Sequence, residues 1–119
     1  MGRDNGWVRV TEVANVAPRE GREVRLNGVA IALFNLGGRF AAVENRCPHR
    51  GGPLADGIVS SLGGSVTVTC PLHNWRVCVD SGEVAKPADA HACVRSFPAR
   101  VENGIVMVDM TAAALEEAA

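Results

Sequence analysis

Cys47-Pro48-His49 and Cys70-Pro71-Leu72-His73 are the two stretches on which the fold and the chemistry of this chain depend. Each offers one soft thiolate and one imidazole at short spacing, inside a loop rich in glycine, proline or other turn-forming residues. The proline that follows each cysteine fixes φ and favours a turn. Two such loops predict a metal centre that takes one cysteine and one histidine from each of them.

Two kinds of metal centre fit two cysteines and two histidines. A structural zinc ion binds four such ligands tetrahedrally, but its ligands usually come as like pairs, C-x₂₋₄-C and H-x₃₋₅-H. In this chain both pairs are mixed, which suits a [2Fe–2S] cluster with two thiolates on one iron and two imidazoles on the other. The residues therefore predict a cluster held by Cys47, His49, Cys70 and His73, with a structural zinc module as the alternative.

The two histidines change the charge of such a cluster. With two ferric ions, two sulfides, two thiolates and neutral imidazoles, the oxidised centre is neutral, whereas an all-cysteine centre is a dianion. A neutral centre accepts an electron more readily, which raises the reduction potential into a range of about −150 to +300 mV. The predicted role is therefore one-electron transfer.

The sequence around these ligands resembles a known family. Residues 47–54, C-P-H-R-G-G-P-L, and residues 70–75, C-P-L-H-N-W, resemble the two cluster-binding loops of Rieske proteins. Further stretches resemble the small subunit of assimilatory NAD(P)H-dependent nitrite reductase, namely residues 54–59, 66–75, 81–83 and 93–102. This likeness covers roughly residues 7–110. Rieske ferredoxins of aromatic-ring dioxygenases share the scaffold and much of the second loop, and they are the alternative.

The resemblance also implies where the reduction potential lies within that range. High-potential Rieske proteins have a disulfide between the two loops, and serine and tyrosine hydroxyls that donate to the cluster. The positions that match those cysteines are Gly52 and Leu72, the position that matches the serine is Trp75, and the chain contains no tyrosine. We therefore expect a potential near the low end, which suits a carrier fed by NAD(P)H through a flavin.

Short apolar runs separated by glycine-rich turns indicate an all-β chain, an antiparallel sandwich or barrel. Tight hairpins are predicted at Gly37-Gly38 and at Asn103-Gly104, which is a strong type I′ signal. The expected strands are residues 7–12, 23–26, 29–36, 40–44, 57–60, 66–69, 76–79, 83–85, 93–102 and 105–109. The resemblance implies one Rieske domain over residues 1–119, with a small cluster-binding subdomain at about 45–88. The tail, 111–119, is expected to be helical or frayed.

Composition and charge argue against several other classes of function. The net charge is −1 with acidic and basic residues interspersed, so no basic stripe indicates nucleic-acid binding. The longest apolar runs, such as residues 28–34, have the length of a strand and are too short to span a bilayer. No signal-peptide core lies near the N-terminus, and we expect a cytoplasmic protein without a membrane segment.

Several other residues near the motifs have structural interpretations. Cys78 and Cys93 lie in β-type runs and are expected to be buried free thiols, with a disulfide or redox role as the alternative. Asp80 precedes a turn and is expected to bond to local backbone. Trp75 is expected to pack beneath its loop, whereas Asn74 either contacts an electron-transfer partner or bonds only to the backbone of its own loop.

The predicted function is to accept one electron and to pass it on. The chain has no G-x-G-x-x-G dinucleotide fingerprint and no Ser/His/Asp or Cys/His nucleophile constellation outside the metal ligands, so we expect neither catalytic residues nor a substrate site on it. The resemblance implies a large flavin- and sirohaem-containing nitrite reductase subunit as the partner, which reduces nitrite to ammonia. The alternative partners are a ferredoxin reductase and the terminal oxygenase of a ring-hydroxylating dioxygenase.

Overall fold

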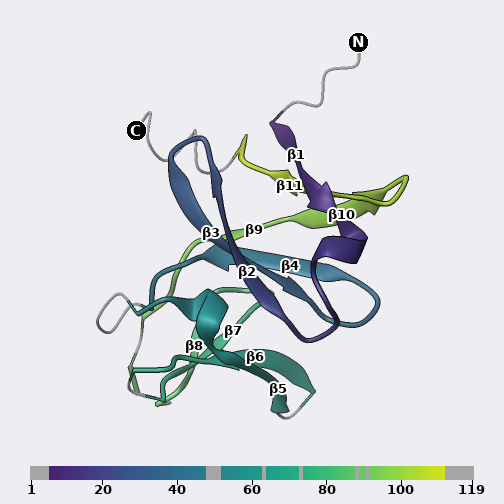
Figure 1. Ribbon diagram of the computed structural model, residues 1–119. Coiled ribbons are helices and arrows are strands. Elements are labelled where there is room, and N and C mark those ends of the chain that lie inside the picture. Colours follow the sequence, from purple (N-terminus) through teal and green to yellow (C-terminus); the bar gives the residue numbers. More distant parts are fainter. Residues whose placement is uncertain are drawn as a thin grey trace.

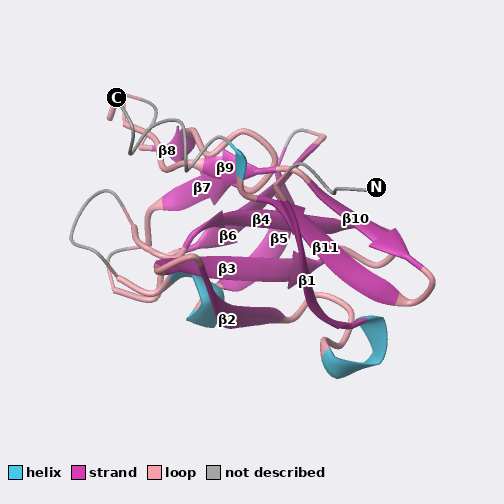
Figure 2. Cartoon of the chain, turned by 90° about the horizontal axis from the view of Figure 1, so that it is seen from above, coloured by secondary structure: helices cyan, strands magenta, loops and turns pink. Residues whose placement is uncertain are grey.

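The computed structural model describes residues 6–47, 52–62, 64–72, 74–87, 89–90 and 92–111. In this part of the chain, strands and two 3-10 turns, η1 (Val13–Asn15) and η2 (Leu54–Asp56), build three antiparallel sheets (Figure 1). Figure 2, seen from above, shows strands as the dominant elements and the 3-10 turns as short cyan segments. The expected all-β class is confirmed.

Each sheet has its own strand order. Sheet A has the order β1-β11-β10 and consists of β1 (Trp7–Glu12), β11 (Ile105–Asp109) and β10 (Ala99–Glu102). Sheet B has the order β2-β3-β4-β9 and consists of β2 (Gly21–Leu26), β3 (Val29–Asn35), β4 (Phe40–Glu44) and β9 (Ser96–Phe97). Sheet C has the order β5-β6-β7-β8 and consists of β5 (Ile58–Leu62), β6 (Ser65–Thr69), β7 (Arg76–Cys78) and β8 (Val84–Lys86).

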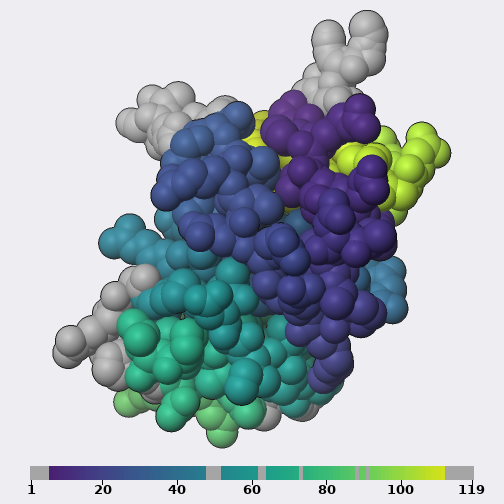
Figure 3. All heavy atoms as spheres, viewed as in Figure 1, coloured from purple at the N-terminus to yellow at the C-terminus, as the bar shows by residue number. Residues whose placement is uncertain are grey.

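Strand β3 lies in the middle of the molecule and is buried on both faces. Its nearly continuous apolar run is what a strand covered on both sides requires. Ala32 and Phe34 belong to the apolar core shared with sheet C, whereas Ile31 and Leu33 belong to the core shared with sheet A. All four residues have an exposed fraction of 0%. Sheet B is therefore the central layer, and in Figure 3 the teal and green atoms of sheet C occupy the lower part of the molecule.

Both predicted hairpin turns are confirmed. Asn103 and Gly104, between β10 and β11, have φ angles of 52° and 79°, the positive values at both central positions that a type I′ turn requires. Between β3 and β4, the Leu36 N–H donates to the carbonyl of Arg39 at 2.8 Å and closes a tight turn at Gly37-Gly38. These turns set the register of the strands that they join.

The prediction of a single strand over residues 93–102 is wrong. The structure has two strands here, β9 and β10, which belong to sheets B and A respectively and are separated by Pro98. Proline has no N–H to donate to a ladder, so the chain leaves one sheet at this point and enters the other. The Pro98 carbonyl still accepts a hydrogen bond from the Asp109 N–H at 2.9 Å. The other expected strands agree with the structure to within two residues at each end.

Some expectations about the organisation of the chain extend beyond the described residues. Most of the tail, residues 112–119, lies outside them. The strands β5 to β8 pair with one another in sheet C, but the limits of the expected subdomain, about 45 and 88, stay a prediction. Across the described ranges, no helix has the length and apolar character that crossing a membrane demands.

A bidentate ion pair joins sheet B to the end of β7 in sheet C. The Arg39 guanidinium donates to both carboxylate oxygens of Asp80, at 2.6 and 2.9 Å, from just before β4 to just after β7. This hydrogen bond from Arg39 holds the pKa of Asp80 below its usual range. The expectation that Asp80 bonds to local backbone is therefore wrong, because its carboxylate binds a cation that lies far away in the sequence.

Removal of this ion pair should weaken the attachment of sheet C by a modest amount. In a double-mutant cycle of Arg39→Ala and Asp80→Asn, we expect a coupling free energy of about 1 kcal/mol at pH 7, since both side chains are roughly half exposed and the pair is screened by solvent. The folded-state pKa of Asp80 is lowered. The coupling free energy is therefore fully present at pH values above the ordinary pKa of aspartate, and it disappears as the pH falls through the folded-state pKa.

Urea unfolding of the four proteins between pH 7 and pH 2 measures this coupling. Any loss of metal in acid affects all four proteins alike and cancels in the cycle. A coupling free energy that stays constant over this pH range would contradict the assignment of the pKa shift to Arg39.

Candidate metal centre

Cys47 lies just beyond the end of β4, in a loop that folds back on itself. Its exposed fraction is 1%, and its N–H donates to the carbonyl of Gly52 at 2.8 Å. Asn45, two residues earlier, donates its N–H to the Ala30 carbonyl at 2.9 Å and accepts the Ala55 N–H on its side-chain oxygen at 2.8 Å. The first cysteine is therefore held by sheet B on one side and by η2 on the other.

Cys70 directly follows β6 and begins an equally tight loop. Its exposed fraction is 1%, its N–H donates to the Trp75 carbonyl at 2.7 Å, and its carbonyl accepts the Asn74 N–H at 3.1 Å. Asn74 has a φ of 61°, the left-handed conformation in which asparagine is among the few tolerated side chains. The local role considered for Asn74 is seen, because its backbone closes the loop around Cys70, and contact with an electron-transfer partner stays a prediction.

The first loop approaches the cysteine of the second loop at Gly52. A Cβ placed on Gly52 in the first loop would lie 2.9 Å from Sγ of Cys70 in the second. Both cysteines belong to the apolar core between sheets B and C, and neither forms a disulfide. Two buried thiols from different loops, brought together at the edge of a core without a bond between them, suit a shared metal centre, in which both bind as thiolates.

The histidine half of the predicted centre stays a prediction. His49 and His73 lie outside the described residues, as does Arg50. Within the described ranges, no three His, Cys, Asp or Glu side chains gather as a metal site, and two histidines would be needed to complete one around Cys47 and Cys70. The structure thus buries the two predicted sulfur ligands in one apolar core.

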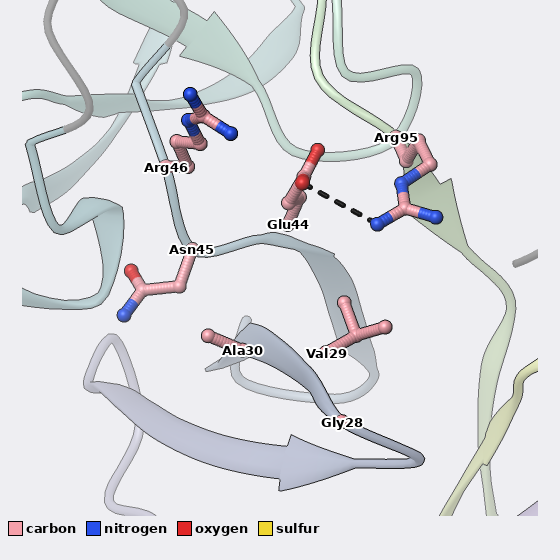
Figure 4. Close-up of a pocket in the computed structure, with 7 residues that line it drawn as sticks. All are labelled: Gly28, Val29, Ala30, Glu44, Asn45, Arg46 and Arg95. Carbon is pink, nitrogen blue, oxygen red and sulfur yellow. Dashed lines mark hydrogen bonds and ion pairs between the residues drawn. The ribbon is translucent and has the colours of Figure 1, made fainter.

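A polar pocket of about 370 Å³ opens beside the first loop (Figure 4). Its lining residues are Gly28, Val29, Ala30, Glu44, Asn45, Arg46 and Arg95. The Arg95 guanidinium donates to the Glu44 carboxylate at 3.4 Å across the pocket. The pocket brings together the β2–β3 turn, the end of β4 and the segment before β9, so the sequence alone gave no sign of it. Neither of the two predicted ligands that the structure describes, Cys47 and Cys70, lines it.

Cys78 and Cys93 differ from the expectation of two buried thiols. Cys78 is half-buried and Cys93 is exposed, and neither forms a disulfide. Glu83 separates them, because its carbonyl accepts the Cys78 N–H at 2.8 Å while Cys93 is its bridge partner on the other side. Two strand spacings amount to about 9–10 Å, which is beyond the reach of a disulfide. Cys93 pairs with Glu83 through an isolated bridge outside the named strands, and its side chain is exposed.

Trp75 has the packing role that its position suggested. It is half-buried and packs against the core that contains Cys47 and Cys70. Its carbonyl accepts the Cys70 N–H, so its backbone holds the second loop while its ring covers the core below. The indole thus helps to keep water from the side of the core nearest the two sulfurs.

Comparison with known proteins shows the family to which this chain belongs. The family model of the Rieske [2Fe–2S] domain matches residues 6–98, a range that contains all four predicted ligands. The chain belongs to the Rieske [2Fe–2S] family, and its cofactor is a Rieske-type [2Fe–2S] cluster. Family membership therefore favours the [2Fe–2S] cluster, with a role in electron transfer, over the structural zinc module that the ligand types alone had left as the alternative.

Similar proteins include two kinds of electron carrier. The biphenyl dioxygenase ferredoxin subunit of Pseudomonas sp. (strain KKS102) is 33% identical over 109 residues, which cover 92% of this chain and 96% of the relative. The 3-phenylpropionate/cinnamic acid dioxygenase ferredoxin subunit of Escherichia coli (strain K12) is 34% identical over 92 residues, 76% of this chain and 83% of the relative. A solved structure from Mycobacterium tuberculosis, proposed to be an NADH-dependent nitrite reductase small subunit, has a TM-score of 0.79 and 30% identity, covering 86% of this chain and 92% of that chain.

Asn74 offers a test of how the second loop holds its cysteine. We expect Asn74→Gly to keep the cluster, because glycine adopts a positive φ freely. Asn74→Val should cost about 1–2 kcal/mol of stability and shorten the lifetime of the cluster, because a β-branched residue is strained in this conformation. Urea unfolding and the decay of visible absorbance under a chelator measure the two effects. Equal behaviour of the valine and glycine variants would contradict this role.

Proposed function

We propose that this chain is a one-electron carrier whose [2Fe–2S] cluster is held by Cys47, His49, Cys70 and His73. The observation that supports it most is the burial of two cysteines from separate loops in one apolar core, each followed in sequence by a histidine at the spacing of a Rieske motif. When bound, the cluster supplies reversible one-electron transfer. Amino-acid side chains do not supply this chemistry at such a potential.

The residues of the chain itself have three roles in this proposal. The apolar core between sheets B and C keeps water away from Cys47 and Cys70, and the backbone bonds to Gly52 and Trp75 fix where the two sulfurs lie. The matching positions at Gly52, Leu72 and Trp75 offer neither a disulfide nor a hydroxyl to the cluster. We therefore propose a reduction potential near the low end of the Rieske range, about −150 mV.

We further propose that the electron partner is the large subunit of an NAD(P)H-dependent nitrite reductase. Support comes from the similarity to the M. tuberculosis structure, at 30% identity over most of both chains, and from the likeness of residues 54–59 and 93–102 to such small subunits. In this assembly the reduction of nitrite to ammonia takes place on the large subunit, and this chain passes electrons without binding substrate. Because the reductant is NAD(P)H, we propose a cytoplasmic location.

A second candidate is a ferredoxin of a ring-hydroxylating dioxygenase. The observation that favours it is the 33% identity to the biphenyl dioxygenase ferredoxin subunit, which spans nearly the whole of both chains. In that system a ferredoxin reductase would supply the electron and a terminal oxygenase would receive it. The two candidates share the cluster and the carrier role, and they differ only in which proteins dock beside the cluster.

The ligand set can be tested by composition and by redox potential. Protein purified without oxygen should contain about two iron ions and about two acid-labile sulfides per chain, and should give a rhombic EPR signal when reduced. His49→Cys adds one negative charge to the cluster and should lower the midpoint potential by on the order of 100 mV. His91→Cys is the matched control, since His91 lies outside both motifs. A chain that holds only zinc would disprove the proposal.

The choice of partner can be tested with the native complex. We expect a large sirohaem protein to copurify with this chain, and nitrite-dependent oxidation of NAD(P)H to fall when the chain is removed and to return when it is added back. Unchanged nitrite reduction without the chain would overturn the nitrite reductase assignment. Electron transfer to a dioxygenase with full coupling to ring hydroxylation would then support the second candidate.

A further inference from the structure

We infer that Gly52 is a positioning residue for the second cysteine, because the space of its missing side chain is occupied by the sulfur of Cys70. The inference rests on the proposed function, in which that sulfur is a cluster ligand. It adds a residue outside the four ligands that determines how closely the two loops approach.

Glycine is often required where the backbone has a positive φ, but the geometry at Gly52 points to a lack of space for a side chain. A Cβ on residue 52 would lie 2.9 Å from Cys70 Sγ and 2.9 Å from Leu72 Cδ1, a closeness that real Cβ atoms essentially never show. The φ of Gly52 is not among the positive values of the chain, so its backbone conformation is open to any residue. Residue 52 is therefore limited by space and not by backbone conformation.

The surroundings show which atom would yield to an added methyl group. The Gly52 carbonyl accepts the Cys47 N–H, and both backbone polar groups of Cys70 are hydrogen-bonded within their own loop, so movement of either backbone stretches these hydrogen bonds. The Leu72 side chain is 55% exposed and can turn towards solvent at small cost. The sulfur of Cys70, at 1% exposure for the residue, has no such freedom and receives the strain.

Displacement of this sulfur has consequences for the cluster that can be measured. Metal–thiolate distances are tolerated only within about 0.2 Å of their ideal values, so a shift of a few tenths of an ångström weakens the bond. The surroundings of the ligand sulfurs also set the reduction potential of an iron–sulfur cluster. A methyl group at residue 52 should therefore change both the retention of the cluster and its potential.

Gly52→Ala is the test variant and Gly38→Ala the matched control. Gly38 is also a glycine without a positive φ, and a Cβ on it meets nothing within 4 Å. We expect Gly52→Ala to lose its visible absorbance about tenfold faster under a chelator and to show a shifted midpoint potential and altered EPR g values. The control should match the wild type in all three measurements. A Gly52→Ala protein that also matches the wild type would overturn the inference.

Leu72→Ala distinguishes the two atoms that crowd residue 52. The single variant should retain the cluster as the wild type does, because Leu72 is largely exposed. In the double variant Gly52→Ala/Leu72→Ala the contact with Cys70 Sγ remains, so the fast cluster loss and the shifted potential should persist. Restoration of wild-type behaviour in the double variant would show that leucine, and not the sulfur, excludes a side chain at residue 52.

A stability cycle covers the case in which Gly52→Ala holds no cluster at all. Measured on metal-free full-length chains, Gly52→Ala should lower the urea midpoint in the wild-type background and lower it much less in a Cys70→Ala background, where the sulfur is gone. An equal loss in both backgrounds would overturn the inference. The proposed function fails separately, through absence of the [2Fe–2S] signal in the wild type, so the two failures are distinguishable.

Discussion

Burial of two cysteines at the edge of one apolar core is the constraint on which the rest of this structure depends. Cys47 follows the turn at the end of β4 in sheet B, and Cys70 follows the end of β6 in sheet C, so each sheet supplies one sulfur. The two sulfurs stay together only while the sheets stay packed. The apolar side chains between sheets B and C, with Val68 and Val77 of sheet C at 0% exposure, therefore also hold the metal centre in place.

The central position of sheet B makes this packing rigid. Strand β3 is covered on one face by sheet C and on the other by sheet A, so neither face of the strand that supports β4 is open to water. The chain then crosses from sheet B to sheet A at Pro98, which ties the outer layer to the central one. A redox centre benefits from such a base, because small movements of a ligand change its potential.

Membership of the Rieske family accounts for the cluster, and the carrier role follows from its chemistry. The structure adds features that membership of the family does not by itself specify. The polar pocket beside the first loop contains Arg46, Arg95 and Glu44, and neither Cys47 nor Cys70 lines it. Cys70 Sγ lies where a side chain at Gly52 would begin, so the two loops pack closely at this point without a disulfide. Both features depend on the meeting of segments from different sheets.

The sequence by itself determined what is local: the strands apart from the division at Pro98, the type I′ turn at Asn103-Gly104 and the cysteine–histidine spacing. Each of these depends on residues that are neighbours along the chain, whose preferences act over a few bonds. The tertiary structure alone decided the ion pair of Arg39 with Asp80, the exposure of Cys93 and the crowding at Gly52. These depend on which distant segments meet, and that is set by the packing of whole sheets, which no short stretch of sequence encodes.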